Sequence, residues 1–267
     1  MMKRISRISL ALLSGLLIAA SWPTNGFTPL IFIAFVPLIF LQDKIGSQQV
    51  NETTSQKVGS VFGLSFLTFL VWNALTTWWV WNSTPAGSIA MMLLNSTFMA
   101  TTFWLYHFTR KKIFNNKKGY FLLILFFLAF ENLHLNWQLN WPWLNIGNVF
   151  SHNHTWIQWY EFTGIAGGTL WVLLANILAY KAIKGQLTKD NRQQSLINVS
   201  LFIAVIIIPI IISKIMYRSY EEKGEEVEVV VVQPNIDPWN EEFNLSAKEI
   251  LMRNFDQAEP LMTENTR

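Results

Sequence analysis

Two glutamates of this 267-residue chain stand where apolar segments end. Glu131 and Glu161 are the only acidic residues between Glu52 and Asp190. An ionisable group that enters the apolar layer of a membrane is costly and tends to have a function, so both carboxylates are candidates for a polar site. The alternative is that each carboxylate simply reaches the headgroup region, and the residues alone leave both interpretations open.

Tryptophans are concentrated in two connections near these glutamates. The connections contain Trp78, Trp79, Trp81, Trp137, Trp141, Trp143, Trp156 and Trp159. An aromatic belt at the level of the lipid headgroups would give this pattern. A second interpretation is a site for lipid headgroups or acyl chains. The length of the connection over residues 136–161 favours that site, because a simple turn needs far fewer residues.

Groups that could bind a metal or act as a strong nucleophile are few. The chain contains no cysteine, which excludes disulfides, cysteine-rich zinc sites and a thiol nucleophile within these residues. His134, His152 and His154 lie close in sequence, but no carboxylate or thiol completes a set at the spacing of metal ligands. We therefore expect no metal and no other cofactor.

The composition indicates that these groups are positioned by a membrane protein. Of all residues 51% are apolar and only 14% are charged, which does not suit a water-soluble surface. Residues 1–216 hold 15 Lys and Arg against 5 Asp and Glu, whereas residues 217–267 hold 5 against 12. The overall charge of +3 describes neither part, so its sign does not indicate a nucleic-acid partner.

Seven segments are predicted transmembrane helices: residues 8–22, 27–41, 58–75, 88–108, 120–135, 162–180 and 196–216. A helix needs roughly 20 apolar residues to cross a bilayer, and the shorter segments depend on flanking aromatic and polar residues to reach the interface. We therefore predict a polytopic α-helical membrane protein, with a transmembrane helical bundle over residues 1–216.

Basic residues predict the orientation of this bundle. The amino-terminal end and alternate connections hold fourteen of them, namely Lys3, Arg4, Arg7, Lys44, Lys57, Arg110, Lys111, Lys112, Lys117, Lys118, Lys181, Lys184, Lys189 and Arg192. The other connections, residues 23–26, 76–87 and 136–161, hold neither Lys nor Arg. Because cytoplasmic loops carry the excess of positive charge, we expect the amino terminus inside and the acidic tail outside.

The first segment has a second interpretation. A basic end followed by the apolar run of residues 8–20 is also typical of a cleaved signal peptide. Removing the segment would leave the orientation of the other six unchanged. The tight polar turn at residues 22–26 favours a helical hairpin, so we predict a membrane helix here.

The tail is predicted to be a linker, residues 217–226, followed by the start of a soluble domain, residues 227–267. The sequence EVEVVVVQ at residues 226–233 predicts a β-strand, and its run of valines predicts a buried one. Ser246 and Glu249 have the spacing of a capping box, and apolar residues follow at helical spacing. One strand and one helix cannot bury a core, so we expect residues beyond Arg267 to complete the domain.

The chain resembles the apolipoprotein N-acyltransferases, bacterial inner-membrane enzymes with a membrane bundle and a periplasmic nitrilase-like domain. The most specific features are Glu131 followed by Trp-Pro-Trp-Leu at residues 141–144, and Val-Val-Gln-Pro-Asn-Ile at residues 231–236 followed by Trp239. The resemblance covers nearly the whole chain. It implies that residues 227–267 begin an α/β nitrilase-like domain, of the carbon–nitrogen hydrolase type, which is an α-β-β-α sandwich.

The resemblance also implies an activity, the transfer of an acyl chain from a membrane phospholipid to the α-amine of the amino-terminal diacylglyceryl cysteine of a lipoprotein. The family forms a thioester on a cysteine, with a glutamate as base and a lysine that stabilises the oxyanion. All three belong to the part of the nitrilase-like domain beyond this chain. No catalytic residue is carried over, and we expect the chain alone to be inactive.

Three substrate-binding residues are carried over from the family. Trp143 and Trp239 match aromatic positions near the family's lipid-facing site, and Glu131 is a structural partner in the same loop. The implied partners are a phospholipid acyl donor, a diacylated apolipoprotein acceptor and the membrane, and we expect a monomer.

Two other interpretations remain. A non-catalytic polytopic lipid-binding protein or transporter would need only the seven spans and the outer aromatic residues. It predicts polar or broken helices at the membrane centre, whereas the predicted spans are largely apolar there. A truncated reading frame of the enzyme, without activity of its own, is compatible with the family resemblance.

Overall fold

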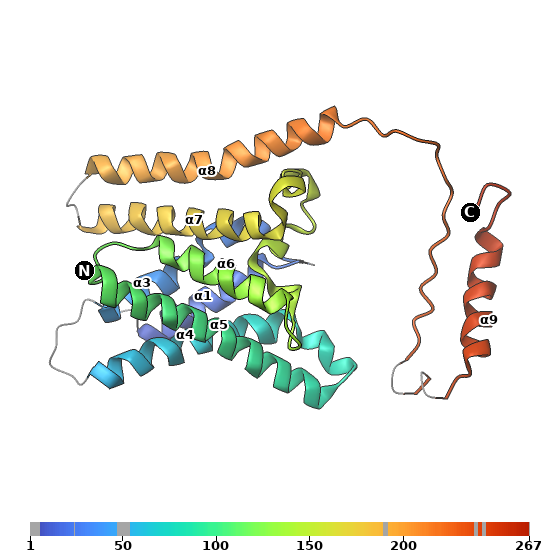
Figure 1. Ribbon diagram of the computed structural model, residues 1–267, viewed down its shortest axis with the longest axis horizontal. Coiled ribbons are helices and arrows are strands. Elements are labelled where there is room, and N and C mark those ends of the chain that lie inside the picture. Colours follow the sequence, from blue (N-terminus) through green and yellow to red (C-terminus); the bar gives the residue numbers. More distant parts are fainter. Residues whose placement is uncertain are drawn as a thin grey trace.

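The structure is a computed structural model that describes residues 6–23, 25–46, 54–188, 192–237, 240–241 and 244–266, with the backbone alone for residues 54–60. Long helices lie side by side in a bundle, and a tail leads away from the last of them (Figure 1). The α-helices are α1 (Arg7–Ser21), α2 (Ile31–Ala34), α3 (Val36–Gly46), α4 (Thr54–Thr76), α5 (Pro85–Phe114), α6 (Phe121–Leu135), α7 (Tyr160–Thr188), α8 (Arg192–Ser219) and α9 (Ala247–Ala258). The 3-10 helices are η1 (Thr28–Leu30), η2 (Trp78–Asn82), η3 (Pro142–Leu144), η4 (Ile146–Phe150), η5 (His154–Trp156) and η6 (Glu259–Leu261).

Each of the seven predicted apolar segments coincides with a helical region. Four regions are long and apolar enough to cross a membrane: Thr28–Gly46, Pro85–Phe114, Tyr160–Thr188 and Arg192–Ser219. The other three are shorter apolar helices, Arg7–Ser21, Val61–Thr76 and Phe121–Leu135. The prediction of a multi-pass helical membrane protein is therefore supported by four helices of sufficient length.

Helices α2 and α3 form one interrupted helix. Pro37 follows the interruption, and proline lacks the N–H that a continuous helix would use. Asn176 of α7 is fully buried against this point. Its Oδ1 accepts the N–H of Phe35 at 2.8 Å and its Nδ2 donates to the carbonyl of Ile31 at 2.7 Å. Backbone groups must be satisfied within a membrane, so this asparagine permits the interruption.

Helix α1 packs deep in the bundle. Ala11 and Ile18 are fully buried. The hydroxyl of Thr68 in α4 donates to the carbonyl of Ala11 at 3.0 Å, and the hydroxyl of Ser14 donates to the carbonyl of Ala34 at 2.6 Å. These hydrogen bonds join α1 to α4 and to α2, so the first apolar segment belongs to the helical core.

The tail differs from its prediction in two places, the expected strand and the start of the linker. Residues 226–233 form no strand, since the described part of the tail shows only an isolated parallel bridge between Glu228 and Thr266. The valines are not buried either, because Val229 and Val231 are 62% and 86% exposed. A strand is stabilised by neighbouring strands, and a single bridge does not provide them. Helix α8 also continues past residue 216 to Ser219.

The predicted capping box at the start of α9 is confirmed. The Glu249 N–H donates to the Ser246 hydroxyl oxygen at 3.3 Å, and the Ser246 N–H donates to the Glu249 carboxylate at 2.7 Å. The Ser246 side chain and backbone donors hold the pKa of the Glu249 carboxyl below its ordinary value. The capping box therefore sets the start of α9, and no residue of this helix is buried.

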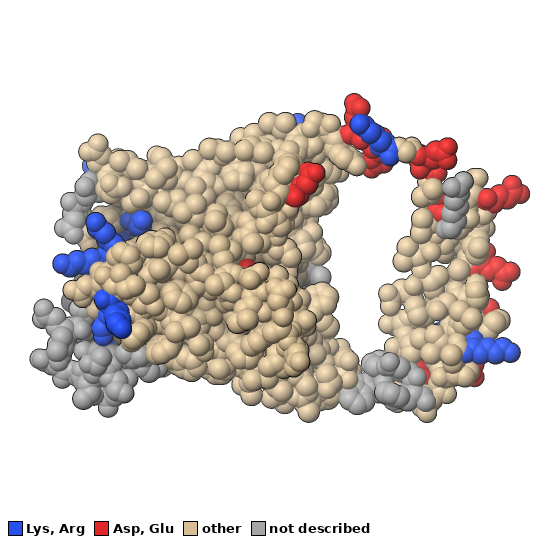
Figure 2. Space-filling view, in the orientation of Figure 1, with Lys and Arg blue, Asp and Glu red and all other residues tan. Residues whose placement is uncertain are grey.

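Charge divides the bundle into two ends (Figure 2). The basic end carries the Lys and Arg side chains that the structure describes at the amino-terminal start and in the α3–α4, α5–α6 and α7–α8 regions: Arg7, Lys44, Arg110, Lys111, Lys112, Lys117, Lys118, Lys181, Lys184 and Arg192. At the opposite end, here called the loop end, η2 to η5 connect the helices without Lys or Arg. The acidic tail leaves the bundle from the loop end (Figure 1).

Candidate functional site

The long connection between α6 and α7 is an ordered cover on the loop end. It folds into η3, η4 and η5, and it buries Ile146, Val149 and Phe150 against the helices. The ring of Phe150 stacks on Trp171 of α7, with ring centroids 4.7 Å apart. The apolar residues of this connection thus form part of the core, which explains how so long a segment keeps one conformation.

Glu131 fastens this connection to the bundle from the inside. The residue is only 5% exposed. Its Oε1 accepts the N–H of Ile146 at 2.7 Å, and its Oε2 accepts the hydroxyl of Thr169 in α7 at 2.7 Å. One carboxylate therefore joins α6, η4 and α7. Through these contacts Glu131 positions the connection, and its contact with a substrate stays a prediction.

The backbone beside Glu131 is close-packed. The Gly147 N–H donates to the Thr169 hydroxyl oxygen at 3.1 Å, and the Gly147 carbonyl accepts the hydroxyl of Tyr160 at 2.9 Å. A Cβ atom added at Gly147 would overlap the carbonyl oxygen of Ile165. Only glycine fits at this close approach between η4 and α7, and both backbone polar groups of Gly147 are satisfied by side chains of α7.

Trp143 lies on the outer surface of this anchored loop. It is 59% exposed, and its ring meets that of Trp79 from η2 edge to face, with centroids 6.1 Å apart. Trp79 is itself 46% exposed. Two connections that are far apart in sequence therefore present neighbouring flat aromatic surfaces at the loop end.

The remaining candidate residues are Trp239 and the histidines. Trp239 lies outside the residues that the structure describes, so its proximity to Trp143 stays a prediction. The imidazole Nδ1 of His134 accepts the indole N–H of Trp137 at 3.0 Å, which is a local contact. Among the described residues, no group of three or more His, Asp or Glu is placed to hold a metal ion. The loop end presents exposed aromatic surfaces, and the chain supplies no thiol nucleophile.

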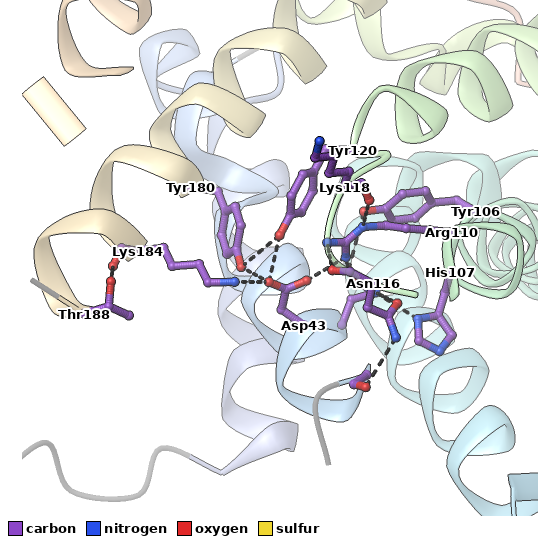
Figure 3. A network of polar contacts seen from close by, with 12 residues as sticks. Asp43, Tyr106, His107, Arg110, Asn116, Lys118, Tyr120, Tyr180, Lys184 and Thr188 are labelled. Atoms are coloured by element: carbon purple, nitrogen blue, oxygen red, sulfur yellow. Dashed lines mark hydrogen bonds and ion pairs between the residues drawn. The ribbon is translucent and has the colours of Figure 1, made fainter. Parts of the chain in front are cut away.

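A second polar cluster, at the basic end, was missed by the sequence analysis (Figure 3). Its centre is the Asp43 carboxylate of α3, whose side chain is 12% exposed. Arg110 of α5 donates to Oδ1 at 2.6 Å, and Lys184 of α7 donates to Oδ2 at 2.6 Å. The hydroxyls of Tyr120 and Tyr180 also donate to Oδ2. The cluster joins α3, α5, α7 and the start of α6.

Arg110 is the most deeply buried member of this cluster, with a fully buried side chain. Beyond Asp43, its Nη1 donates to the Gln42 side-chain oxygen at 2.6 Å. Its Nε donates to the Lys118 carbonyl at 2.8 Å, and its Nη2 donates to the Asn116 carbonyl at 2.6 Å. The guanidinium also lies over the Tyr120 ring, 3.8 Å from its centroid. These contacts satisfy the charge and fix the turn between α5 and α6.

The position of Asp43 in the sequence could have indicated this cluster. Asp43 lies at the end of the predicted span 27–41, and Arg110 follows the predicted span 88–108. An ionisable residue so close to an apolar span calls for a partner on another helix. Arg110 and Lys184 indicate orientation by their charge, but their positions in the sequence do not show that both meet Asp43.

The comparisons with known proteins agree with the resemblance. A family model described as the apolipoprotein N-acyltransferase N-terminal domain matches residues 14–178. A protein of Chlorobaculum tepidum named apolipoprotein N-acyltransferase is 25% identical over 249 residues, covering 91% of this chain and 44% of its own length. A protein of the same name from Geobacter metallireducens is 25% identical, covering 85% of this chain and 43% of its own length.

A third relative, also named apolipoprotein N-acyltransferase and from Rickettsia bellii, is 25% identical, covering 90% of this chain and 46% of its own length. The chain spans less than half the length of these curated relatives. No solved structure matches the chain.

Proposed function

The chain belongs to the apolipoprotein N-acyltransferase family, and from this premise we propose that it forms the membrane half of a lipoprotein N-acyltransferase of the bacterial inner membrane. In this proposal all seven apolar regions cross the membrane. The basic end faces the cytoplasm and the tail begins a periplasmic nitrilase-like domain. The enzyme acts as a monomer on a phospholipid and on a diacylated apolipoprotein.

The observation that carries this proposal is the anchored loop of the loop end. Glu131 fixes the connection that carries Trp143, and Trp143 lies beside Trp79 at the loop end. The tail leaves the bundle from the same end (Figure 1). Exposed aromatic faces at this level can pack against acyl chains and headgroups. The loop end is therefore suited to bring a lipid toward a soluble domain placed above it.

The chemistry in this proposal takes place in residues outside the chain. A cysteine thiolate, formed when the glutamate takes the thiol proton, would attack the ester carbonyl of the phospholipid. The thioester forms as the ester C–O bond breaks, and the leaving oxygen takes that proton to give the lysophospholipid alcohol. The α-amine of the acceptor would then attack the thioester, expelling the thiolate and losing a proton to a glutamate. The chain has no cysteine, so we expect residues 1–267 alone to give no triacylated product.

Orientation can be tested with single cysteines, because the chain has none of its own. Asn115 follows α5 at the basic end, and Asn153 lies before η5 at the loop end. In intact cells, a thiol reagent that cannot cross the inner membrane should label Asn153→Cys and leave Asn115→Cys unlabelled. Labelling of Asn115→Cys with Asn153→Cys protected would overturn the proposed orientation and the periplasmic site.

The activity can be tested with a chimera. Residues 1–267 would replace the aligned amino-terminal part of the Chlorobaculum tepidum relative, and the product would be assayed with phospholipid and a diacylated lipopeptide. The chimera should form triacylated lipopeptide, and Trp143→Ala should lower its rate about two- to tenfold, the value of an aromatic contact. Trp81→Ala is the matched control, because Trp81 is also exposed and belongs to η2.

The outcomes of this assay separate the alternatives. A chimera that inserts and resists proteolysis but forms no product would contradict the proposed function. Equal rates for Trp143→Ala and Trp81→Ala would assign both tryptophans to an aromatic belt and remove Trp143 from the substrate site.

A further inference from the structure

A groove lies between α6 and α7 at the basic end. It has a volume of about 370 Å³, and its residues divide into two chemical classes. Ile124, Leu174 and Ile177 supply an apolar wall, and Lys117, Lys118 and Lys181 supply positive charge. Lys117 and Lys118 lie in the turn before α6, and Lys181 lies one turn beyond Ile177 within α7, whereas the apolar residues lie deeper within α6 and α7. The groove therefore has the charge distribution that suits an amphiphile with an anionic head.

The positive charge of this groove is not neutralised by the protein that the structure describes. The described carboxylate of the basic end is that of Asp43, and it pairs with Arg110 and Lys184. In the described part of the chain, Lys117, Lys118 and Lys181 form no ion pair, and all three are exposed. An anion bound beside this groove would meet three lysines without breaking a described ion pair.

Lys118 and Tyr120 line the groove and also belong to the polar cluster around Asp43, whose contacts fix the turn at this end of the groove (Figure 3). Arg110 holds the turn before α6 through the carbonyl of Lys118, at 2.8 Å. Gly119 closes the turn with a φ of +83°, and a Cβ there would meet Cδ2 of Phe114 at 2.5 Å, so the position requires glycine. The Tyr120 ring lies 3.8 Å from the Arg110 guanidinium and 5.8 Å from the Lys181 ammonium. The lysines are thus carried on a preorganised support.

We propose that this groove binds an anionic phospholipid, with the headgroup phosphate on Lys117, Lys118 and Lys181 and one acyl chain along Ile124, Leu174 and Ile177. Basic pockets between transmembrane helices recognise anionic headgroups by this combination of charge and apolar contact. The site lies at the basic end, opposite the Trp143 loop, so it is separate from the proposed acyl transfer and does not rest on it.

The apolar wall distinguishes a lipid from a free phosphate ion. Burying apolar surface contributes about 25 cal/mol per Å², and an inorganic ion cannot gain this term. An acyl chain that follows the wall gains it, and the same wall positions the headgroup at the lysines. The groove therefore favours an anionic lipid over a free anion.

Native mass spectrometry of the full purified chain can test this site. The chain in detergent would receive equal amounts of phosphatidylglycerol and phosphatidylcholine with identical acyl chains. The wild type should retain phosphatidylglycerol in preference. The double variant Lys118→Gln/Lys181→Gln should reduce that preference by about fivefold for each lysine, and Ile124→Trp, which fills the groove, should reduce it with all charges kept.

Lys111→Gln/Lys112→Gln is the matched control, because it removes the same charge from the basic end outside the groove. It should keep the preference. An equal loss of the phosphatidylglycerol preference in this control would show a diffuse electrostatic attraction instead of a site. Absence of the preference in the wild type would also overturn the proposal. Loss in the lysine variant alone, with inorganic phosphate displacing the bound species, would indicate a free-anion site and contradict the lipid. Thermal unfolding of each variant verifies folding, and Lys181→Gln alone repeats the test with one exposed substitution.

Discussion

Asp43 and Glu131 are both shielded carboxylates of the bundle, at opposite ends, and they are satisfied by different kinds of donor. Asp43 accepts from the cations of Arg110 and Lys184 and from two tyrosine hydroxyls. Glu131 accepts only neutral donors in its described contacts, the N–H of Ile146 and the hydroxyl of Thr169. The first carboxylate joins helices, and the second holds a loop.

The two carboxylates differ in the groups that their removal would leave unpaired. Loss of Asp43 would leave the fully buried guanidinium of Arg110 without its counter-ion, whereas loss of Glu131 would leave only an amide and a hydroxyl unpaired. An uncompensated buried charge is much more costly than an unpaired neutral group. The basic end should therefore control the stability of the bundle, and the loop end should control the position of one surface.

The largest effect is expected for Arg110→Ala. It leaves Asp43 with one half-exposed cation and frees the carbonyls of Asn116 and Lys118, so we expect a loss of about 3–5 kcal/mol in the free energy of unfolding. Denaturant titration of the purified chain in mixed micelles measures this quantity.

The double variant Asp43→Leu/Arg110→Met is the control for this prediction. It removes both charges with little change of volume, so it should be clearly more stable than Arg110→Ala. Equal stability of the two variants would show that the charge pair is not what holds this end together.

A smaller and more local effect is expected for Glu131→Ala. Two buried donors lose their acceptor, which costs about 1–3 kcal/mol, and the connection over residues 136–159 should open before the bundle unfolds. Limited proteolysis should cut this connection faster than in the wild type, at an unchanged rate for the α5–α6 turn. Glu131→Gln keeps one acceptor for the Ile146 N–H and should protect the loop. Equal cleavage in all three proteins would remove the anchoring role.

The sequence predicted those parts of the fold that depend on local composition. Apolar runs located all seven helical regions, and the Ser246 and Glu249 spacing located the start of α9. The basic end and the loop end follow from counts of Lys and Arg along the chain. Each of these signals lies within one segment, so no knowledge of the packing is needed.

The parts that were missed depend on contacts between distant segments. Asp43 meets Arg110 and Lys184 only after three helices have packed, and periodicity within one helix contains no sign of that. Trp79 and Trp143 are neighbours for the same reason. The strand predicted at residues 226–233 was wrong because a local pattern was present without its distant partner. β-branched residues favour a strand only where a neighbouring strand pairs with it.

A weaker contact at the loop end is the pair of Trp79 and Trp143. The double-mutant cycle with Trp79→Ala, Trp143→Ala and both together should give a coupling of about 0.5–1.5 kcal/mol, the value of an edge-to-face aromatic pair. Glu131→Ala should abolish the coupling, because it releases the loop that carries Trp143. A coupling that survives Glu131→Ala would mean that the two indoles hold the loop by themselves.

The smallest effect is expected for Lys184→Ala, although Lys184 binds the same carboxylate as Arg110. Its ammonium is 2.6 Å from Oδ2 of Asp43, but its side chain is 46% exposed, whereas that of Arg110 is fully buried. Water and salt screen an exposed pair, so the substitution should cost only about 0.2–1 kcal/mol, and less in high salt. Unfolding of Lys184→Ala and Arg110→Ala at low and high ionic strength provides the measurement. A large, salt-independent loss for Lys184→Ala would show that Asp43 is shielded from solvent on both sides, and the contrast between the two cations would disappear.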